Sequence, residues 1–337
     1  MDGTGHPRGT KLAAKKPLTT LDELSANSET FQPKPRTSTG TNSKRLDNTM
    51  TEKQKVVVIG ATGNVGPHAV SQLLEKGVET RALTLPDDPK INRLEEGVEV
   101  FHGDLSDPDS LDRCLEGATS VFLMWPFFTL DVETVPDVLK RIKQHTEKVV
   151  FVSSIGVQNG IETVDNRCHA FVEREIERLG MEWTFLRTTG FCCNAGTGWA
   201  HQIRSEGVVR SPYGNATRSP IHEADLAAVA VRALTEEGHS GQRYVVTGPE
   251  ALSQIEQLRI ISEVSGREAR WVDVPHESAS TNMIESGWPA AYAEGALEYF
   301  AILTKEPERV TSTVEEVLER PARTFRQWSE ENSDLFR

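Results

Sequence analysis

A short apolar run, a glycine-rich loop and an amphipathic helix follow one another early in this chain, and this succession constrains its fold most. The run "KVVVIG" (55–60) is typical of a buried strand, and the apolar residues of "NVGPHAVSQLLEKG" (64–77) share one helical face. Alternating strands and helices predict right-handed crossovers and a parallel sheet covered on both faces, an α/β doubly wound architecture. Further strands are predicted over 78–83, 98–104, 119–125, 148–154 and 182–188, with helices over 131–145 and 166–179.

The chain divides by composition into three parts. Residues 1–50 are rich in Ser, Thr, Pro, Gly and Lys and show little periodicity, so they cannot bury enough apolar surface to offset the entropy of ordering. We expect a disordered leader there, a dinucleotide-binding core over 51–190 and a smaller C-terminal α/β substrate lobe over 191–337, interleaved with the core.

Charge and cysteine spacing narrow the class of protein. The net charge of −13 argues against a nucleic-acid partner, and the chain lacks an apolar run long enough for a membrane helix or a secretion signal. The four cysteines do not have the spacing of a metal site. We therefore expect a cytoplasmic protein with no metal and no membrane partner. Cys192 and Cys193 are predicted to be pocket-wall residues rather than a redox pair.

The glycine loop predicts a dinucleotide site. In "GATGNVG", Gly60, Gly63 and Gly66 stand between a predicted strand and a predicted helix. Glycines at these positions permit a tight turn, let backbone N–H groups approach a pyrophosphate and let the helix pack closely on the sheet. The helix N-terminus then faces the phosphates with its partial positive charge.

The next two strand ends offer weaker signals. No acid stands on the second strand to bind a ribose hydroxyl, because Asp87 and Asp88 come after Pro86. Arg81 is either a 2′-phosphate contact or a strand-edge cation, and the pattern favours neither. In "GDLSDP" (103–108), Asp104 and Leu105 are placed to flank an adenine, although helix capping by the following residues explains the same pattern.

The segment "LMWPFF" (123–128) ends the fourth predicted strand, at the sheet edge where ligands sit in doubly wound folds. Trp125, Phe127 and Phe128 are therefore candidates for a pocket wall, with core packing as the equally good alternative. Farther along, "SPIHEADLAAVAVRALTE" (219–236) predicts a helix in which His222 is a cap. The aromatic residues of 276–305 predict either a lid or a helix packed on the lobe.

Taken together, several of these stretches resemble the NmrA-like family of atypical short-chain dehydrogenases. The stretches are "VVVIGATGNVG", "GDLSDPDSL", "FVSSIG", "HAFVEREIERLGMEWTFLRTTGFCCN", "SPIHEADLAAVAVRALTE" and "YVVTGPEALS", and the resemblance runs from about residue 55 to 336. It implies NAD(P)H-dependent reduction of a quinone or imine, as in the ergot-alkaloid reductases, or a non-catalytic redox sensor with a protein partner. The resemblance implies a cofactor site formed by Gly60, Thr62, Gly63, Asn64, Val65, Gly66, Asp104, Leu105, Trp125 and Pro126.

The resemblance also assigns Ser153 to the nicotinamide side and Phe191 to the substrate mouth, with Trp199 grouped among the pocket aromatics. One departure concerns the cofactor, NADP or NAD. The family often carries an arginine for the 2′-phosphate where this chain has Leu85, so a preference for NADPH is not assured.

The proton donor is the open question. Many dehydrogenases follow a serine such as Ser153 with Tyr-x-x-x-Lys on the next helix, but this chain has no such motif and offers His169 and Glu173 there. We expect His169 or water to donate the proton. The alternatives are a helix-face pair of His169 with Glu173, an acceptor that needs little acid assistance, or a sensor without chemistry. The aromatic cluster favours an enzyme acting on a flat, mostly apolar small molecule.

Overall fold

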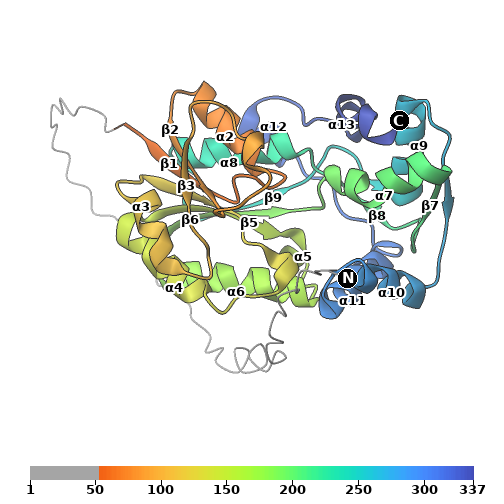
Figure 1. The fold of residues 1–337 in the computed structure, drawn as a ribbon, viewed down its shortest axis with the longest axis horizontal. Coiled ribbons are helices and arrows are strands. Elements are labelled where there is room, and N and C mark those ends of the chain that lie inside the picture. The colour runs from red at the N-terminus through yellow and green to blue at the C-terminus, as the bar shows by residue number, and fades with distance from the viewer. Residues whose placement is uncertain (1–52) are drawn as a thin grey trace, which may run out of the picture. The chain divides into compact units, whose positions relative to one another are not determined.

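A computed structural model describes residues 53–337 of the chain, so the predicted leader over 1–50 lies outside the described residues. At its centre is a seven-stranded sheet with the order β3-β2-β1-β4-β5-β6-β9, in which every neighbouring pair is parallel (Figure 1). The doubly wound prediction is therefore confirmed. The strands are β1 (Lys55–Ile59), β2 (Glu79–Thr84), β3 (Glu99–His102), β4 (Ser120–Leu123), β5 (Lys148–Ser154), β6 (Glu182–Thr188) and β9 (Gln242–Val246).

Helices cover both faces of this sheet because successive side chains of a strand point to opposite sides. On β1, Val56 and Val58 pack under one helical layer, while Val57 and Ile59 pack under the other. The first layer holds α2 (Gly66–Glu75), α8 (Glu223–Thr235) and α12 (Thr313–Leu318). The second holds α3 (Asp112–Leu115), α4 (Val135–His145) and α6 (Val164–Arg178), with the 3₁₀ turns η2 (Pro108–Leu111) and η3 (Phe127–Thr129) beside them.

A smaller lobe has a core of its own, built around Trp199, Ile203, Phe325 and Trp328. It carries two short two-stranded sheets, β10-β8 and β11-β7. Figure 1 shows these elements grouped beyond the sheet, with α10 and α11 together. The lobe consists of α7 (Cys193–Glu206), β7 (Val208–Arg210), β8 (Thr217–Arg218), β10 (Leu252–Ser253), α9 (Gln254–Ser265), β11 (Arg270–Val272), α10 (His276–Glu285), α11 (Ala290–Leu303), α13 (Phe325–Glu331) and η4 (Ser333–Phe336).

The end of the chain is tied back to the sheet half. The Asp225 carboxylate at the start of α8 is fully buried, and it accepts hydrogen bonds from Arg320 Nη2 at 2.8 Å and from the guanidinium of Arg323. One turn earlier, His222 Nε2 lies 3.0 Å from Glu331 Oε2 on α13. A fold is strongly destabilised when a buried charge loses its partner. These ion pairs therefore make the C-terminal residues an integral part of the folded structure.

Local capping chemistry explains where the predicted helix boundaries moved. The helix predicted over 131–145 begins at Val135, because the Asp131 carboxylate accepts the Glu133 N–H in a turn of its own. The helix predicted over 219–236 begins at Glu223, where His222 Nδ1 accepts the Ala224 N–H. The capping interpretation of His222 is therefore confirmed. Within residues 53–337, none of the helices has the length and apolarity to span a membrane.

Candidate functional site

The glycine loop joins β1 to α2 through a turn that requires glycine. Gly60 has a φ of +86°, a left-handed conformation that side chains disfavour, and the Gly63 N–H donates to Gly60 O at 3.1 Å. At Gly66 a Cβ atom would lie 2.2 Å from Gly60 O and 2.6 Å from the Ala61 backbone. The helix therefore starts in direct contact with the end of the strand, and only glycine permits that contact.

This geometry fits the pyrophosphate of a dinucleotide. The first turn of α2 leaves backbone N–H groups without partners inside the helix, and these point along its axis past the loop. Asn64 is exposed at the loop surface, while Val65 is fully buried and fixes the loop on the core. The residues Gly60 to Gly66 would thus hold the phosphates by backbone groups.

An acid from the segment after β2 reaches the same loop. The Thr62 hydroxyl donates to Asp88 Oδ2 at 2.5 Å, and the Lys90 N–H donates to Asp88 Oδ1 at 2.9 Å. These hydrogen bonds, first that from Thr62, lower the pKa of the Asp88 carboxyl, so it is charged at neutral pH. The sequence pattern placed Asp88 in a turn after Pro86, and the residue spacing carried no signal that the turn folds back onto Thr62.

Arg81 is occupied by partners within the sheet half rather than by the loop. Its guanidinium donates to the backbone carbonyls of Cys114 at 3.0 Å and Glu116 at 2.8 Å, and to Glu99 Oε2 at 2.9 Å. A guanidinium engaged by the carbonyls that end α3 acts as a cap for that helix. The strand-edge alternative is the closer description.

The segment after β3 is held by hydrogen bonds between its own side chains and backbone. Asp104 is exposed, and its carboxylate accepts the Ser106 N–H at 2.8 Å, while Ser110 Oγ accepts the Asp104 N–H at 3.0 Å. Leu105 is half-buried and packs against the second-layer core. Helix capping by Ser106 or Asp107 is not observed: η2 begins after Asp107 without a side-chain cap.

The aromatic segment after β4 splits between core and surface. Trp125 is buried, and its indole N–H donates to Asp131 O at 2.8 Å. Phe127 is also buried in the second-layer core, whereas Phe128 is 54% exposed. Pro126 is half-buried between them. At this end of β4, Met124, Pro126 and Phe128 keep apolar surface exposed.

Ser153 is committed to a buried ion pair. Its hydroxyl donates to Glu173 Oε1 at 2.6 Å, and Glu173 also accepts from Arg187 Nη2 at 2.6 Å and Nε at 3.0 Å. Ser153 is 1% exposed and Glu173 4% exposed. A hydroxyl whose proton serves this pair cannot also donate to a substrate, so the predicted pocket role of Ser153 becomes a structural one.

His169 does not pair with Glu173 either. Its ring packs against that of Phe127, with the centroids 3.7 Å apart and the ring planes tilted by 38°, and no hydrogen bond to its buried Nδ1 occurs within the described residues. Burial lowers the pKa of His169 to about 3. At neutral pH the ring is therefore uncharged, which removes the imidazolium that a histidine general acid requires.

The remaining predicted pocket residues fall into two groups. Phe191 lies at the end of β6, half-buried, and forms a parallel bridge with Ile221. Trp199 instead packs edge-on against Trp271 and is buried inside the lobe core. Cys192 and Cys193 lie beside Phe191, and burial raises the pKa of both thiols, which disfavours a reactive thiolate.

Sequence reasoning missed a second charged group, near the end of β6. Arg218 on β8 contacts Gly190 and forms an ion pair with the buried carboxylate of Glu308. No spacing rule links these residues, because Arg218 and Glu308 are 90 positions apart. They meet only because α11 carries the chain back across the lobe.

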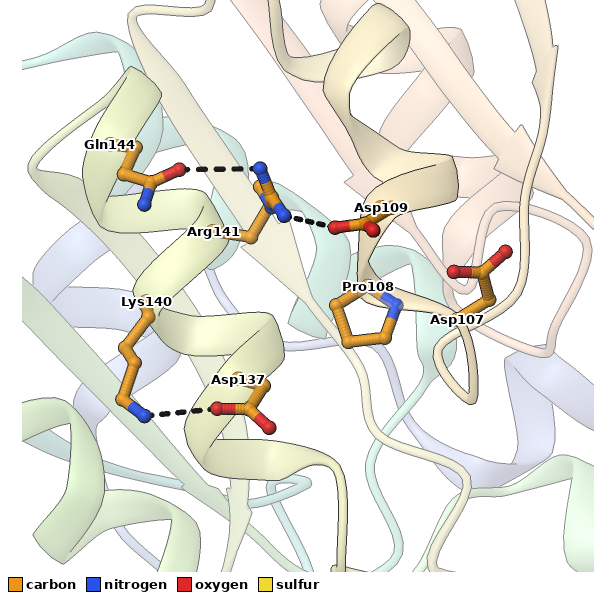
Figure 2. Close-up of a pocket in the computed structure, with 7 residues that line it drawn as sticks. All are labelled: Asp107, Pro108, Asp109, Asp137, Lys140, Arg141 and Gln144. Carbon is orange, nitrogen blue, oxygen red and sulfur yellow. Dashed lines mark hydrogen bonds and ion pairs between the residues drawn. The ribbon is translucent and has the colours of Figure 1, made fainter.

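Two surface hollows lie away from the glycine loop and the strand ends. One, of 340 Å³, separates η2 from α4, and Figure 2 shows Arg141 paired with Asp109 and Lys140 with Asp137, while Asp107 lies apart from both pairs. The other, of 530 Å³, runs over the outer surfaces of α2 and α8. Neither one is lined by residues from the carboxyl ends of the strands, where the doubly wound fold binds its ligands.

Comparisons with known proteins agree with this architecture. A (4-alkanoyl-5-oxo-2,5-dihydrofuran-3-yl)methyl phosphate reductase of Streptomyces griseus is 35% identical over 83% of this chain and 99% of its own length. An NAD(P)H azoreductase of Xenophilus azovorans is 32% identical over the same shares of the two chains. The NADP(H) complex of the Citrobacter sp. triphenylmethane reductase superposes with a TM-score of 0.69 at 22% identity, covering 82% of this chain and 99% of that one. The NmrA-like family matches residues 52–330, and with relatives above 30% identity over most of its length, the chain belongs to the NmrA-like family.

Proposed function

We propose that this chain is an NAD(P)H-dependent oxidoreductase that reduces a flat, mostly apolar quinone, imine or carbonyl compound by hydride transfer. The observation that carries the proposal is the contact at Gly66, which brings the start of α2 against the end of β1 and fits a bound pyrophosphate. The names of the two relatives above, both reductases, support the same activity.

The division of labour follows from the positions of the residues. When bound, NAD(P)H supplies the hydride. The loop from Gly60 to Gly66 fixes the pyrophosphate, and the segment after β4 presents Pro126 and Phe128 beside it. The buried side chains of Trp125 and Phe127 support that segment from below and keep water out of the core. The proposed partners are accordingly a dinucleotide and a small-molecule acceptor.

The choice between NADPH and NADH depends on charge near the loop. Asp88 places a carboxylate next to Thr62, but Lys90 and Arg93 follow within five residues and act on that carboxylate. The Asp88 carboxylate would repel a 2′-phosphate, whereas Lys90 and Arg93 would attract it. Leu85 contributes no charge. We therefore propose that both cofactors bind, with weak discrimination between them.

Fluorescence titration with NADPH and NADH, followed by a turnover screen with quinones, imines and carbonyl compounds, tests the proposal. We expect binding of both cofactors and cofactor oxidation with at least one acceptor. Gly63→Val should abolish binding, because a branched side chain would fill the space that the pyrophosphate needs beside Gly60 O. Tight cofactor binding without turnover of any acceptor would overturn the enzymatic proposal and favour the sensor alternative.

A further inference from the structure

Within the described residues, Arg218 uses only one of its five N–H donors. Its Nε donates to Glu308 Oε1 at 3.2 Å, while within residues 53–337 neither terminal nitrogen, Nη1 nor Nη2, donates a hydrogen bond. The side chain is 18% exposed, so these two nitrogens are not sealed in the core. A guanidinium presents a planar fork of donors that fits oxygen atoms, and here the fork is open on one side.

The surroundings hold this fork in place. The guanidinium stacks over the rings of Tyr299 and Phe300, at 5.1 Å and 5.7 Å from their centroids. Glu308 is itself fixed by hydrogen bonds from Thr189 Oγ1, the Ser219 N–H and Tyr299 Oη. Burial acts to lower the pKa of Arg218, but Glu308 and the neighbouring tyrosines raise it above its ordinary value, so the positive charge is permanent.

The fork lies at the carboxyl edge of the sheet because of a glycine. A Cβ atom on Gly190, two residues after β6, would lie 2.8 Å from Arg218 Nη1. Any other residue at position 190 would push the guanidinium away from the strand end. This is the edge at which the doubly wound fold binds its ligands.

Among the four tyrosines, Tyr292 has the only hydroxyl without a hydrogen bond within the described residues. Tyr213 bonds His276 at 2.8 Å, Tyr244 bonds His239 at 2.8 Å, and Tyr299 donates to Glu308 at 2.7 Å. Tyr292 lies on α11 seven residues before Tyr299, so the two share a helical face. It stacks on Trp288 and packs against the second-layer core, on the helix that contacts α6.

Arg218 lies over the ring of Tyr299, on the face of α11 that Tyr292 shares. Burial, with a contribution from Asp165, raises the pKa of the Tyr292 phenol, and the charge of Arg218 opposes that rise. The phenol therefore keeps its proton at neutral pH. A protonated phenol beside a cation is the combination that Tyr-x-x-x-Lys supplies in other dehydrogenases, but here both groups come from the lobe side.

We propose that Tyr292 and Arg218 form the acid and the oxyanion-binding group of the reaction, acting on an acceptor that contains a conjugated carbonyl group. The inference rests on the proposed function and names the substrate class for it. The Nη groups of Arg218 bind the carbonyl oxygen, and Tyr292 donates its proton to that oxygen. Phe191, after Gly190, and Phe128, after β4, would contact the flat ring system.

The step balances in atoms and electrons. Hydride adds to a carbon of the conjugated system, and the π electron pair moves onto the carbonyl oxygen. The oxyanion that results is bound by Arg218 and takes the phenol proton of Tyr292, and the tyrosinate regains a proton from water. Arg218 binds the oxyanion more strongly than the neutral carbonyl, so its effect falls on the rate of the step rather than on substrate affinity.

The test compares Tyr292→Phe and Arg218→Gln with the parent, using 1,4-naphthoquinone and 2-cyclohexenone as acceptors. Tyr292→Phe should lower kcat by about 10²–10⁴-fold and abolish the solvent isotope effect on kcat, with KM and the Kd of NADPH changed less than about threefold. Arg218→Gln should lower kcat by about 10²–10³-fold. Tyr244→Phe removes a phenol that is bonded to His239 on the far side of the sheet, and it serves as the matched control.

Melting temperatures separate chemistry from folding, because Arg218→Gln leaves Glu308 without its ion-pair partner. If that variant does not fold, Arg218→Lys keeps the charge but not the fork, and we expect at least a tenfold loss of kcat. Normal kcat in Tyr292→Phe would overturn the inference and leave the proposed function intact. A weakened Kd for NADPH in folded Arg218 variants, at unchanged kcat, would overturn it by assigning Arg218 to the cofactor. Absence of turnover in the parent would overturn both.

Discussion

The glycine loop and the edge of the sheet that faces the lobe are built on opposite principles. The tight turn of the loop is formed by contacts between Gly60 and Gly66, and Asp88 adds a hydrogen bond to Thr62 from the segment after β2, so most of the loop's conformation is set by seven consecutive residues. At the lobe-facing edge, Glu308 holds Thr189 from 119 positions away and Arg218 from 90 positions away. A local site depends on backbone conformation, whereas a site assembled from distant segments depends on the packing of the whole lobe.

The largest expected effect tests whether the Ser153 region is structural. Glu173→Ala removes the partner of Arg187 in a buried ion pair and should lower the free energy of unfolding by about 3–5 kcal/mol, measured by urea denaturation. Ser153→Ala removes one donor from the same pair and should cost about 1 kcal/mol. Folded Ser153→Ala should retain the parent kcat. A hundredfold loss of kcat in that variant would show that Ser153 takes part in catalysis after all.

Because the glycine loop is a local site, a single added methyl group should be enough to disrupt cofactor binding. Gly66→Ala places a Cβ atom within 2.2 Å of Gly60 O, so we expect at least a hundredfold loss of NADPH affinity together with a lower melting temperature. Gly198→Ala, in the middle of α7, is the matched control because its added methyl group meets no atom within 4 Å. That control should bind the cofactor normally and gain slightly in stability. Normal affinity in Gly66→Ala would contradict the proposed seat of the pyrophosphate.

His169 links the lobe-facing edge to pH through stability. Its pKa is lowered to about 3 in the folded chain, whereas an unfolded histidine takes up a proton near pH 6.5. The unfolded state therefore binds the extra proton between these two pH values, and stability should fall as the pH drops from 6.5 toward 3.

Urea denaturation of the parent and of His169→Phe at pH 7 and pH 4.5 measures this contribution. Phenylalanine keeps the ring contact with Phe127 but cannot be protonated, so the variant should lose about 2 kcal/mol less stability than the parent over that range. His201→Gln, on the exposed surface of α7, should behave as the parent does. Equal losses in the parent and His169→Phe would show that the ring is accessible to protons in the folded state.

The smallest effect concerns cofactor choice beside the loop. Leu85 follows β2 and is 51% exposed, so an arginine there needs no repacking. Leu85→Arg should strengthen NADPH binding by about ten- to a hundredfold and barely change NADH binding, because only the former offers a phosphate to the guanidinium. Asp88→Asn should act in the same direction by removing a charge. A parent that already prefers NADPH more than a hundredfold would direct attention to Lys90 and Arg93.

The sequence predicted the regions formed by consecutive residues better than those assembled from distant segments. Strands β5 and β6 were predicted to their exact bounds, and the glycine loop by spacing alone, since periodicity and glycine geometry are local properties. The role of Ser153 was not predictable in this way, because its partner Glu173 is shared with Arg187 on another strand. Tyr292 and Arg218 carried no motif, and their proximity appears only when α11 packs on α6.

The ties between α8 and the chain end also bear on how the protein is made. A ribosome releases Asp225 some ninety-five residues before it releases Arg320, and His222 more than a hundred before Glu331. Until those partners have been synthesised, the Asp225 carboxylate, which is buried in the finished fold, has no counter-charge. The first helical layer therefore cannot pack completely on the sheet. This half of the molecule should therefore reach its final packing only after Arg320, Arg323 and Glu331 have left the ribosome.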